Sequence, residues 1–190
     1  MANKNAPFGL RAIGKVGQNR DNQGLSEYSI AANNTTTIYF QDAVKPMASG
    51  TIQHAAAGDI LLGSLNGVFY TDPTTSKPTF ANHYAQVNAS DIVAFVSDDP
   101  YERFEIQTDI STASQQTDVF MNADIVVTAG NSANNVSKTQ LDDGTLATAN
   151  GQLKIIAASN DVDNSDIGSG YLNWVVMINE HQYNAAVAGV

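Results

Sequence analysis

Residues 91–108 read D-I-V-A-F-V-S-D-D-P-Y-E-R-F-E-I-Q-T and carry the clearest strand signals in the chain. The run Ile92–Val96 is apolar throughout, as in a strand that is covered on both faces. The next residues, Ser97–Pro100, combine short polar side chains with a proline and predict a turn. Apolar and polar residues then alternate over Arg103–Gln107, as in a strand with one solvated face. We therefore expect a central β-hairpin.

Short apolar runs separated by turn residues recur along the rest of the chain, and no stretch shows helical periodicity over about 11 residues. The further strand candidates are Leu25–Ile30, Thr35–Phe40, Asp59–Thr71, Phe80–Tyr84, Val119–Thr128, Leu153–Ala158 and Tyr171–Glu180. This pattern predicts an all-β fold, a small barrel or sandwich of roughly eight to ten short strands.

Two of these candidates leave alternatives open. Asn66-Gly67 inside Asp59–Thr71 is a strong hairpin signal, but the stretch also fits one long strand kinked at Gly63. Tyr171–Glu180 is apolar on both faces, which indicates either a central strand or a strand covered by a partner subunit.

Residues 1–24 are predicted to form an extended N-terminal arm, followed by a single β-rich domain over residues 25–190. Pro7 and closely spaced glycines exclude a regular element in the arm. Its apolar side chains still need a place to pack. They fold back on their own domain or dock on a neighbouring subunit, and the sequence leaves both alternatives open.

The charge is distributed unevenly between the arm and the body. Residues 1–20 contain four basic residues and no acidic one, whereas residues 21–190 contain five basic and 19 acidic residues. The net charge of the whole chain is −10, which disfavours binding to nucleic acid. No apolar run approaches the roughly 18 residues of a membrane-spanning helix. The chain has no cysteine, which excludes disulfides and thiolate metal sites.

No catalytic or cofactor-binding constellation is recognisable, so we expect neither an enzyme nor a cofactor. His54, His83 and His181 are isolated from other plausible metal ligands. Asp161-x-Asp163-x-Ser165 matches the start of a calcium loop but lacks its glycine and its final glutamate.

Four stretches carry a family resemblance. They are N-A-P-F-G-L-R (Asn5–Arg11), A-A-A-G-D-I-L-L-G (Ala55–Gly63), V-S-D-D-P-Y-E-R-F-E-I-Q (Val96–Gln107) and W-V-V-M-I-N-E-H-Q (Trp174–Gln182). Together they resemble the capsid decoration, or cement, proteins of tailed bacteriophages, of the kind common among marine phages. One departure is Ala12, where related sequences lead us to expect proline.

The resemblance implies a β-rich virion protein that binds the outer surface of an icosahedral capsid and strengthens it, often as a homotrimer. Its partners would be the major capsid protein and further copies of itself. The N-terminal residues expected to contact the capsid are Phe8, Leu10, Arg11, Ile13 and Lys15. A basic arm with apolar side chains suits an acidic capsid subunit.

Two other classes of phage protein share the expected fold. A host-recognition module of a tail fibre would expose aromatics such as Tyr70, Tyr84 or Tyr101 for stacking on a sugar. A tail-tube or head-completion protein would form rings instead of threefold clusters.

Overall fold

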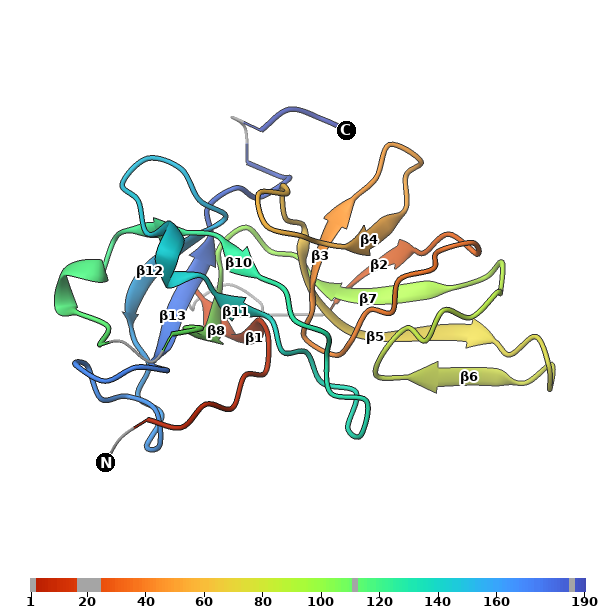
Figure 1. The fold of residues 1–190 in the computed structure, drawn as a ribbon. Helices are drawn as coiled ribbons and strands as arrows, with labels where there is room; N and C mark the ends of the chain where they lie inside the picture. Colours follow the sequence, from red (N-terminus) through yellow and green to blue (C-terminus); the bar gives the residue numbers. More distant parts are fainter. Residues whose placement is uncertain (1–2, 17–24, 111–112, 185–186) are drawn as a thin grey trace.

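The computed structural model describes residues 3–16, 25–110, 113–184 and 187–190. The described chain consists of antiparallel sheets and two short 3₁₀ turns, with no α-helix in these ranges, so the predicted all-β class is confirmed (Figure 1). The described residues form thirteen strands, above the expected range, because several strands have only two or three residues.

One sheet has five strands in the order β1 (Arg11–Lys15), β8 (Glu102–Gln107), β13 (Asn173–Ile178), β12 (Leu153–Ala158) and β9 (Asn122–Ala123). A second has six: β2 (Ser26–Ser29), β7 (Val93–Ser97), β5 (Gly63–Thr71), β3 (Ala43–Pro46), β4 (Ile52–His54) and β6 (Pro78–Ala81), the last paired with β5. A two-stranded sheet joins β10 (Ile125–Val126) to β11 (Gln140–Leu141), and the 3₁₀ turns are η1 (Gln116–Asp118) and η2 (Asp143–Thr145).

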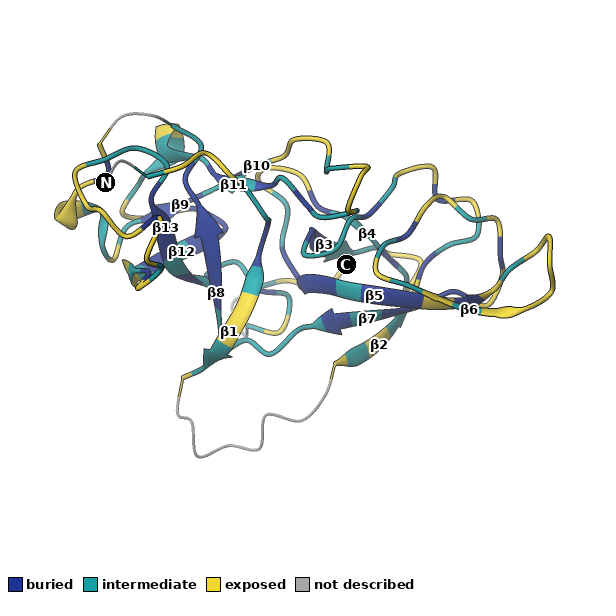
Figure 2. Cartoon of the chain, turned by 90° about the horizontal axis from the view of Figure 1, so that it is seen from below, coloured by how far each residue is buried: buried dark blue, intermediate teal, exposed yellow. Residues whose placement is uncertain are grey.

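The two large sheets lie side by side as two lobes of the molecule (Figure 1). The six-stranded sheet comes from one continuous part of the chain, β2 to β7, whereas the five-stranded sheet combines β1 with strands that follow β7. Each sheet buries its own apolar cluster. Trp174 and Phe104 are central to the first cluster, and Tyr84 and Ile38 to the second. Dark blue strands in both lobes mark these interiors in Figure 2.

The expected central hairpin is wrong, although both of its strands exist. β7 pairs with β2 and β5, and β8 pairs with β1 and β13, so the residues between them carry the chain from one sheet to the other. The polar turn forms as predicted: the Asp99 carboxylate accepts a hydrogen bond from the Tyr101 amide at 2.8 Å. A local turn signal does not say which strand lies beside which, and each of the two strands pairs with other strands instead.

β5 is a single nine-residue strand that begins at Gly63, so the Asn66-Gly67 hairpin is wrong, and the long-strand alternative is correct except for its kink at Gly63. Its irregularity is a bulge between Leu65 and Gly67 opposite β7. Gly63 is needed for a different reason. A Cβ there would lie 2.1 Å from the carbonyl oxygen of Ser97, so only glycine allows this close approach to the end of β7.

Thr35–Phe40, another strand candidate, forms only isolated bridges, in which Ile38 faces Tyr84 and Phe40 faces Val136. By contrast, Leu153–Ala158 has the predicted bounds, and the Tyr171–Glu180 candidate contains β13. β13 is a central strand of the five-stranded sheet, as the first of its two alternatives expects.

Residues 3–16 pack against the chain's own body, and Arg11–Lys15 forms β1, so the expectation that this segment holds no regular element is wrong. Leu10 is fully buried among residues of the five-stranded lobe, and its carbonyl accepts a hydrogen bond from the Ser64 hydroxyl of β5 at 2.6 Å. Gly9 has φ +84°, and a Cβ at this position would lie 2.3 Å from the carbonyl oxygen of Gln41. The segment is therefore fitted closely between the two sheets. The predicted arm boundary at residue 24 lies outside the described residues.

Candidate partner-binding face

The outer face of the five-stranded sheet gathers basic and apolar side chains from four strands. Strand register places Arg11, Glu105, Val175 and Ala157 in one row across β1, β8, β13 and β12. A second row contains Arg103, Met177 and Lys154. We call these seven residues, with the bulge residues Ile13 and Ile156 beside them, the basic face. A shallow hollow on it is lined by Arg11, Ile13, Arg103, Glu105, Ile156 and Val175, among others.

The single acidic residue of the basic face is neutralised inside it. The Glu105 carboxylate is buried and pairs with the Arg11 guanidinium, whose Nε lies 3.0 Å from Oε2. Glu105 also accepts a hydrogen bond from the Ser159 hydroxyl. The Arg11 guanidinium stacks over the Phe8 ring, with 4.4 Å between Cζ and the ring centroid. This packing fixes Arg11 in place on the face.

Arg103 and Lys154 form no ion pair within the described ranges. Arg103 donates to the Lys15 carbonyl at 3.3 Å, which orients its side chain along the β1 edge. The residues Arg11, Arg103, Lys154 and Glu105 give the basic face a formal charge of +2, and Asp161, which also lines the hollow, reduces it to +1 in a chain of net charge −10. It is thus a positive surface on a strongly acidic protein.

The predicted capsid-contact residues separate into three environments. Arg11 and Ile13 lie on the basic face, with Ile13 49% exposed, and Phe8 is half-buried beside Arg11. Leu10 is 0% exposed, so it is a core residue and presents no surface to a partner. Lys15 points to the opposite side of β1 and pairs with Asp99 at 2.9 Å. The assignment of this segment to capsid binding stays a prediction.

Sequence reasoning missed Arg103, Lys154, Val175 and Met177 as members of the same surface. Alternation in Arg103–Gln107 did indicate a polar face, but Glu105 and Gln107 proved to be buried at 4% and 1% exposure. Gln107 is covered by the N-terminal segment: its amide nitrogen donates to the Lys4 carbonyl at 2.9 Å, and its oxygen accepts from the Ala6 amide at 2.8 Å.

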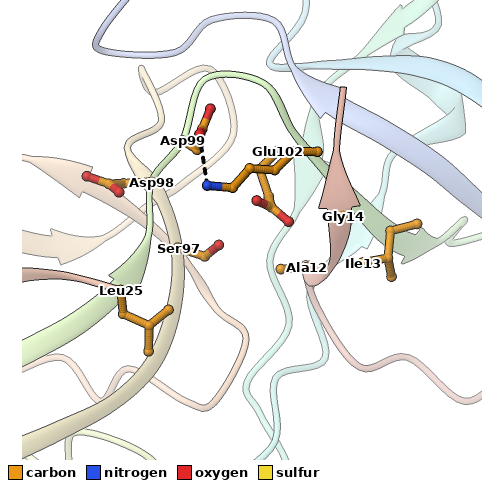
Figure 3. Close-up of a pocket in the computed structure, with 9 residues that line it drawn as sticks. Ala12, Ile13, Gly14, Leu25, Ser97, Asp98, Asp99 and Glu102 are labelled. Carbon is orange, nitrogen blue, oxygen red and sulfur yellow. Dashed lines mark ion pairs between the residues drawn. The ribbon is translucent and has the colours of Figure 1, made fainter. Parts of the chain in front are cut away.

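On the other side of β1, a cavity lies at the seam between the two sheets (Figure 3). Its lining includes Lys15, Asp98, Asp99, Glu102 and Leu25. Burial raises the pKa of the Glu102 carboxyl, with the nearby Lys15 ammonium opposing this effect. The Asp98 carboxylate accepts a hydrogen bond from the Ser26 hydroxyl at 2.8 Å.

The Tyr28 hydroxyl also donates to Asp98, at 2.5 Å. Burial is the largest cause that raises the pKa of Tyr28, and the hydrogen bond to Asp98 raises this pKa further. The acids of the seam therefore tie β1 and β2 to the residues that cross between the sheets.

The remaining sequence candidates have structural partners. Asp161 accepts from the Asp163 amide at 2.9 Å and from the Asn173 side chain at 3.1 Å, so its carboxylate stabilises the loop. The Nε2 atom of His54 lies 3.3 Å from the Oδ2 atom of Asp42. Within the described chain, no group of three or more His, Asp or Glu side chains is arranged to hold a metal ion.

The aromatic platform that a sugar-binding module would need does not form from the expected residues. Tyr70 and Tyr84 are buried, at 8% and 0% exposure, and both belong to the cluster under the six-stranded sheet. Tyr101 is exposed, but it lies in the connection between the sheets.

Comparisons with known proteins add no relative: no family model, no curated protein and no solved structure matches this chain. No helix among the described residues is long and apolar enough to cross a membrane.

Proposed function

We propose that this chain is a structural virion protein that binds the outer surface of an icosahedral phage capsid and stabilises the shell. In this proposal it acts without catalysis or cofactor, its partners are the major capsid protein and further copies of itself, arranged as a homotrimer, and it resides on the capsid exterior. The proposed class of protein comes from the sequence resemblance to decoration proteins. The observation that carries the proposal at the level of chemistry is the basic face.

A basic and apolar sheet face favours an acidic protein surface as its partner. Arg103 and Lys154 would steer an acidic capsid subunit toward the face, and Val175, Met177 and Ile156 offer apolar area for close contact. The remaining acidic surface of the chain would repel such a partner elsewhere. The charge distribution thus selects one orientation on the shell. Many copies on one capsid add avidity to a modest single contact.

Deletion of residues 2–20 is a poor test, because it removes Leu10 from the core and β1 from the sheet. A charge reversal separates binding from folding. Lys154→Glu places an acid on the basic face, and Lys77→Glu makes the same charge change on the exposed connection between β5 and β6. Both side chains lack an ion pair in the described part of the chain.

The assay mixes each purified protein with expanded capsids that lack it, and follows sedimentation and added density by microscopy. We expect saturable binding of the wild type and of Lys77→Glu on the outer surface. Lys154→Glu should bind at least about tenfold more weakly, because a like charge then faces the acidic partner. Wild-type protein that stays in the supernatant at every concentration contradicts the proposal. Equal binding of the two variants would show that the basic face does not contribute to capsid binding.

A further inference from the structure

A polar hollow lies where the connection between β10 and β11 runs along the six-stranded lobe (Figure 1). Its volume is about 400 Å³, within the roughly 300–1,000 Å³ of many ligand-binding pockets. Five of its lining residues carry hydroxyl groups: Thr35, Thr36, Thr37, Tyr39 and Thr128. We call the space around these five residues the hydroxyl hollow. It shares no lining residue with the basic face, so the two are separate surfaces of the described chain.

Asp42 and His54 also line the hydroxyl hollow, but the carboxylate already has partners within the chain. Asp42 is 1% exposed, and its Oδ2 accepts a hydrogen bond from the Tyr39 amide at 2.7 Å and lies 3.3 Å from Nε2 of His54. Its Oδ1 accepts a long hydrogen bond from the Thr139 hydroxyl, at 3.5 Å. The described residues contain no group of acidic and histidine side chains arranged for a metal ion. A cation is therefore not the expected ligand.

Hydrogen bonds hold the first wall of the hydroxyl hollow in shape. The Gln86 side-chain amide, which also lines the hollow, donates to the Thr37 hydroxyl at 3.0 Å. The Ile38 amide donates to the Tyr84 carbonyl at 3.1 Å, and the Tyr84 amide donates to the Ile38 carbonyl at 2.8 Å. Because these bonds fix the wall in advance, a ligand loses little affinity to ordering it.

The second wall comes from residues 127–130, which follow β10. Gly130 lies against the Tyr39 ring, where an added Cβ would stand 2.3 Å from Cγ. Only glycine allows the connection to approach the ring this closely. The Phe40 amide also donates to the Asn135 carbonyl of the same connection, at 2.9 Å. The two walls are thus fixed relative to each other.

The chemistry of the lining selects a neutral ligand that is rich in hydroxyl groups. Threonine and tyrosine hydroxyls both donate and accept hydrogen bonds, as does the amide of Gln86, and sugar hydroxyls do the same. Among the described residues no lysine or arginine lines the hollow, and the chain has a net charge of −10, so an anion is disfavoured. The apolar side chains of the lining, Val127 and Ala129, are too few for an apolar ligand.

We propose that the hydroxyl hollow binds a neutral carbohydrate. This site differs from the aromatic platform expected of Tyr70, Tyr84 and Tyr101, because it depends on hydroxyl and amide groups instead of ring stacking. It adds sugar binding to the proposed capsid-binding role and uses no residue of the basic face.

Titration of the isotope-labelled protein with neutral sugars, followed by NMR, tests the site without a capsid. The panel contains glucose, galactose, mannose, N-acetylglucosamine and short oligomers of each. We expect saturable binding of at least one sugar, with the shifted amide signals centred on Thr35–Thr37, Gln86 and Thr128.

Two substitutions remove single hydroxyl groups while keeping the branched shape of the side chain. Thr36→Val and Thr128→Val, both at exposed positions, should each weaken binding about threefold to tenfold, since each removes one hydrogen bond to the ligand. Thr74→Val makes the same change on the exposed connection between β5 and β6 and should bind like the wild type. Gln86→Asn is the further variant, used if urea unfolding shows that a valine variant is poorly folded. It shortens the amide, and asparagine tolerates the φ of +57° at this position.

A wild type that binds no sugar of the panel at millimolar concentration overturns the inference. Sugar binding that Thr36→Val and Thr128→Val leave unchanged, or that Thr74→Val weakens equally, also overturns it. Capsid sedimentation separates this inference from the proposed function, and Thr128→Val should bind capsids like the wild type. A protein that binds capsids but no sugar leaves the proposed function standing, and one that binds sugar but no capsid leaves this inference standing.

Discussion

Both large sheets are antiparallel, but they differ in which parts of the chain supply their strands and in the side chains on their outer faces. The five-stranded sheet takes its edge strand, β1, from the N-terminal segment and its other strands from residues after β7. The six-stranded sheet is built within residues 26–97. Outward, the first presents Arg11, Arg103 and Lys154, and the second presents phenylalanines.

The comparison shows that the origin of an edge strand influences which side chains come together on the outer face of a sheet. Closing the five-stranded sheet with a remote segment brings Arg11 to Glu105 and completes a charged face that no continuous stretch encodes. The six-stranded sheet needs no remote segment, and its outer face owes its character to local alternation of aromatic and buried residues. One face suits a partner of opposite charge, and the other suits an uncharged surface.

The largest expected effect concerns the remote segment. Leu10→Ala should lower the free energy of unfolding by about 2–5 kcal/mol, because it empties a fully buried position in the core of the five-stranded lobe. Ile13→Ala, three residues along at 49% exposure, should change it by less than about 0.5 kcal/mol. Urea unfolding followed by tryptophan fluorescence measures both, since Trp174 lies in the same cluster as Leu10. If Leu10→Ala lowered the free energy of unfolding as little as Ile13→Ala does, the segment would not be part of the folded core.

Sequence periodicity predicted which residues form strands more reliably than which strands pair. The apolar run of Leu153–Ala158 matches β12, and Ile92–Val96 overlaps β7, because apolar runs of strand length are local signals. The hairpin expected between β7 and β8 was wrong because pairing depends on partners that lie far away in the sequence. β8 finds β1 about ninety residues earlier and β13 about seventy residues later.

The basic face was only partly predictable for the same reason. Arg11 and Ile13 stood out because the first residues are basic and apolar. Arg103 and Lys154 did not, since only the order β1-β8-β13-β12 brings them together. The neighbouring positions of Phe69, Phe80 and Phe95 on the outer face of the six-stranded sheet were not predicted, because they lie on three strands that only the pairing of β5 with β6 and β7 brings together.

A medium effect is expected at Gly67, over which the Phe80 ring lies on the outer face of the six-stranded sheet. Gly67→Ala places a Cβ 2.8 Å from Phe80 Cζ and 3.0 Å from the Ala81 carbonyl oxygen. It should cost about 1–3 kcal/mol of stability through overpacking and displace the Phe80 ring. Thermal unfolding measures the loss of stability.

The control for this substitution is a double-mutant cycle with Phe80→Ala. Removing the ring first leaves room for the new Cβ, so Gly67→Ala should cost clearly less in the Phe80→Ala background. An equal cost in both backgrounds would mean that the backbone around Ala81, and not the ring, requires glycine at position 67. The Phe80 ring would then lack the support that fixes it.

The smallest expected effect concerns the C-terminal segment that joins the two lobes. The Leu61 amide donates to the Glu180 carbonyl at 2.9 Å, and the Gln182 amide donates to the Leu61 carbonyl at 2.8 Å. His181 between them is fully buried, and its ring lies 5.5 Å from that of Tyr183. Burial lowers the pKa of His181, and the Asp98 and Asp99 carboxylates at the seam oppose this shift only in part.

A histidine whose pKa is lower in the native state binds fewer protons there than in the unfolded chain, so its stabilising contribution is complete above the unfolded pKa of about 6.5. The contribution is lost as the pH falls toward the lowered native pKa. Urea unfolding between about pH 7.5 and 5 should therefore show declining stability, with a shallower decline in His181→Gln. His83→Gln is the comparison, because burial also lowers the pKa of His83, but its ring stacks on Tyr39 and is not among the residues that line the seam cavity. A steeper decline in His181→Gln than in His83→Gln would place the acid-sensitive contact inside the six-stranded lobe instead of between the two.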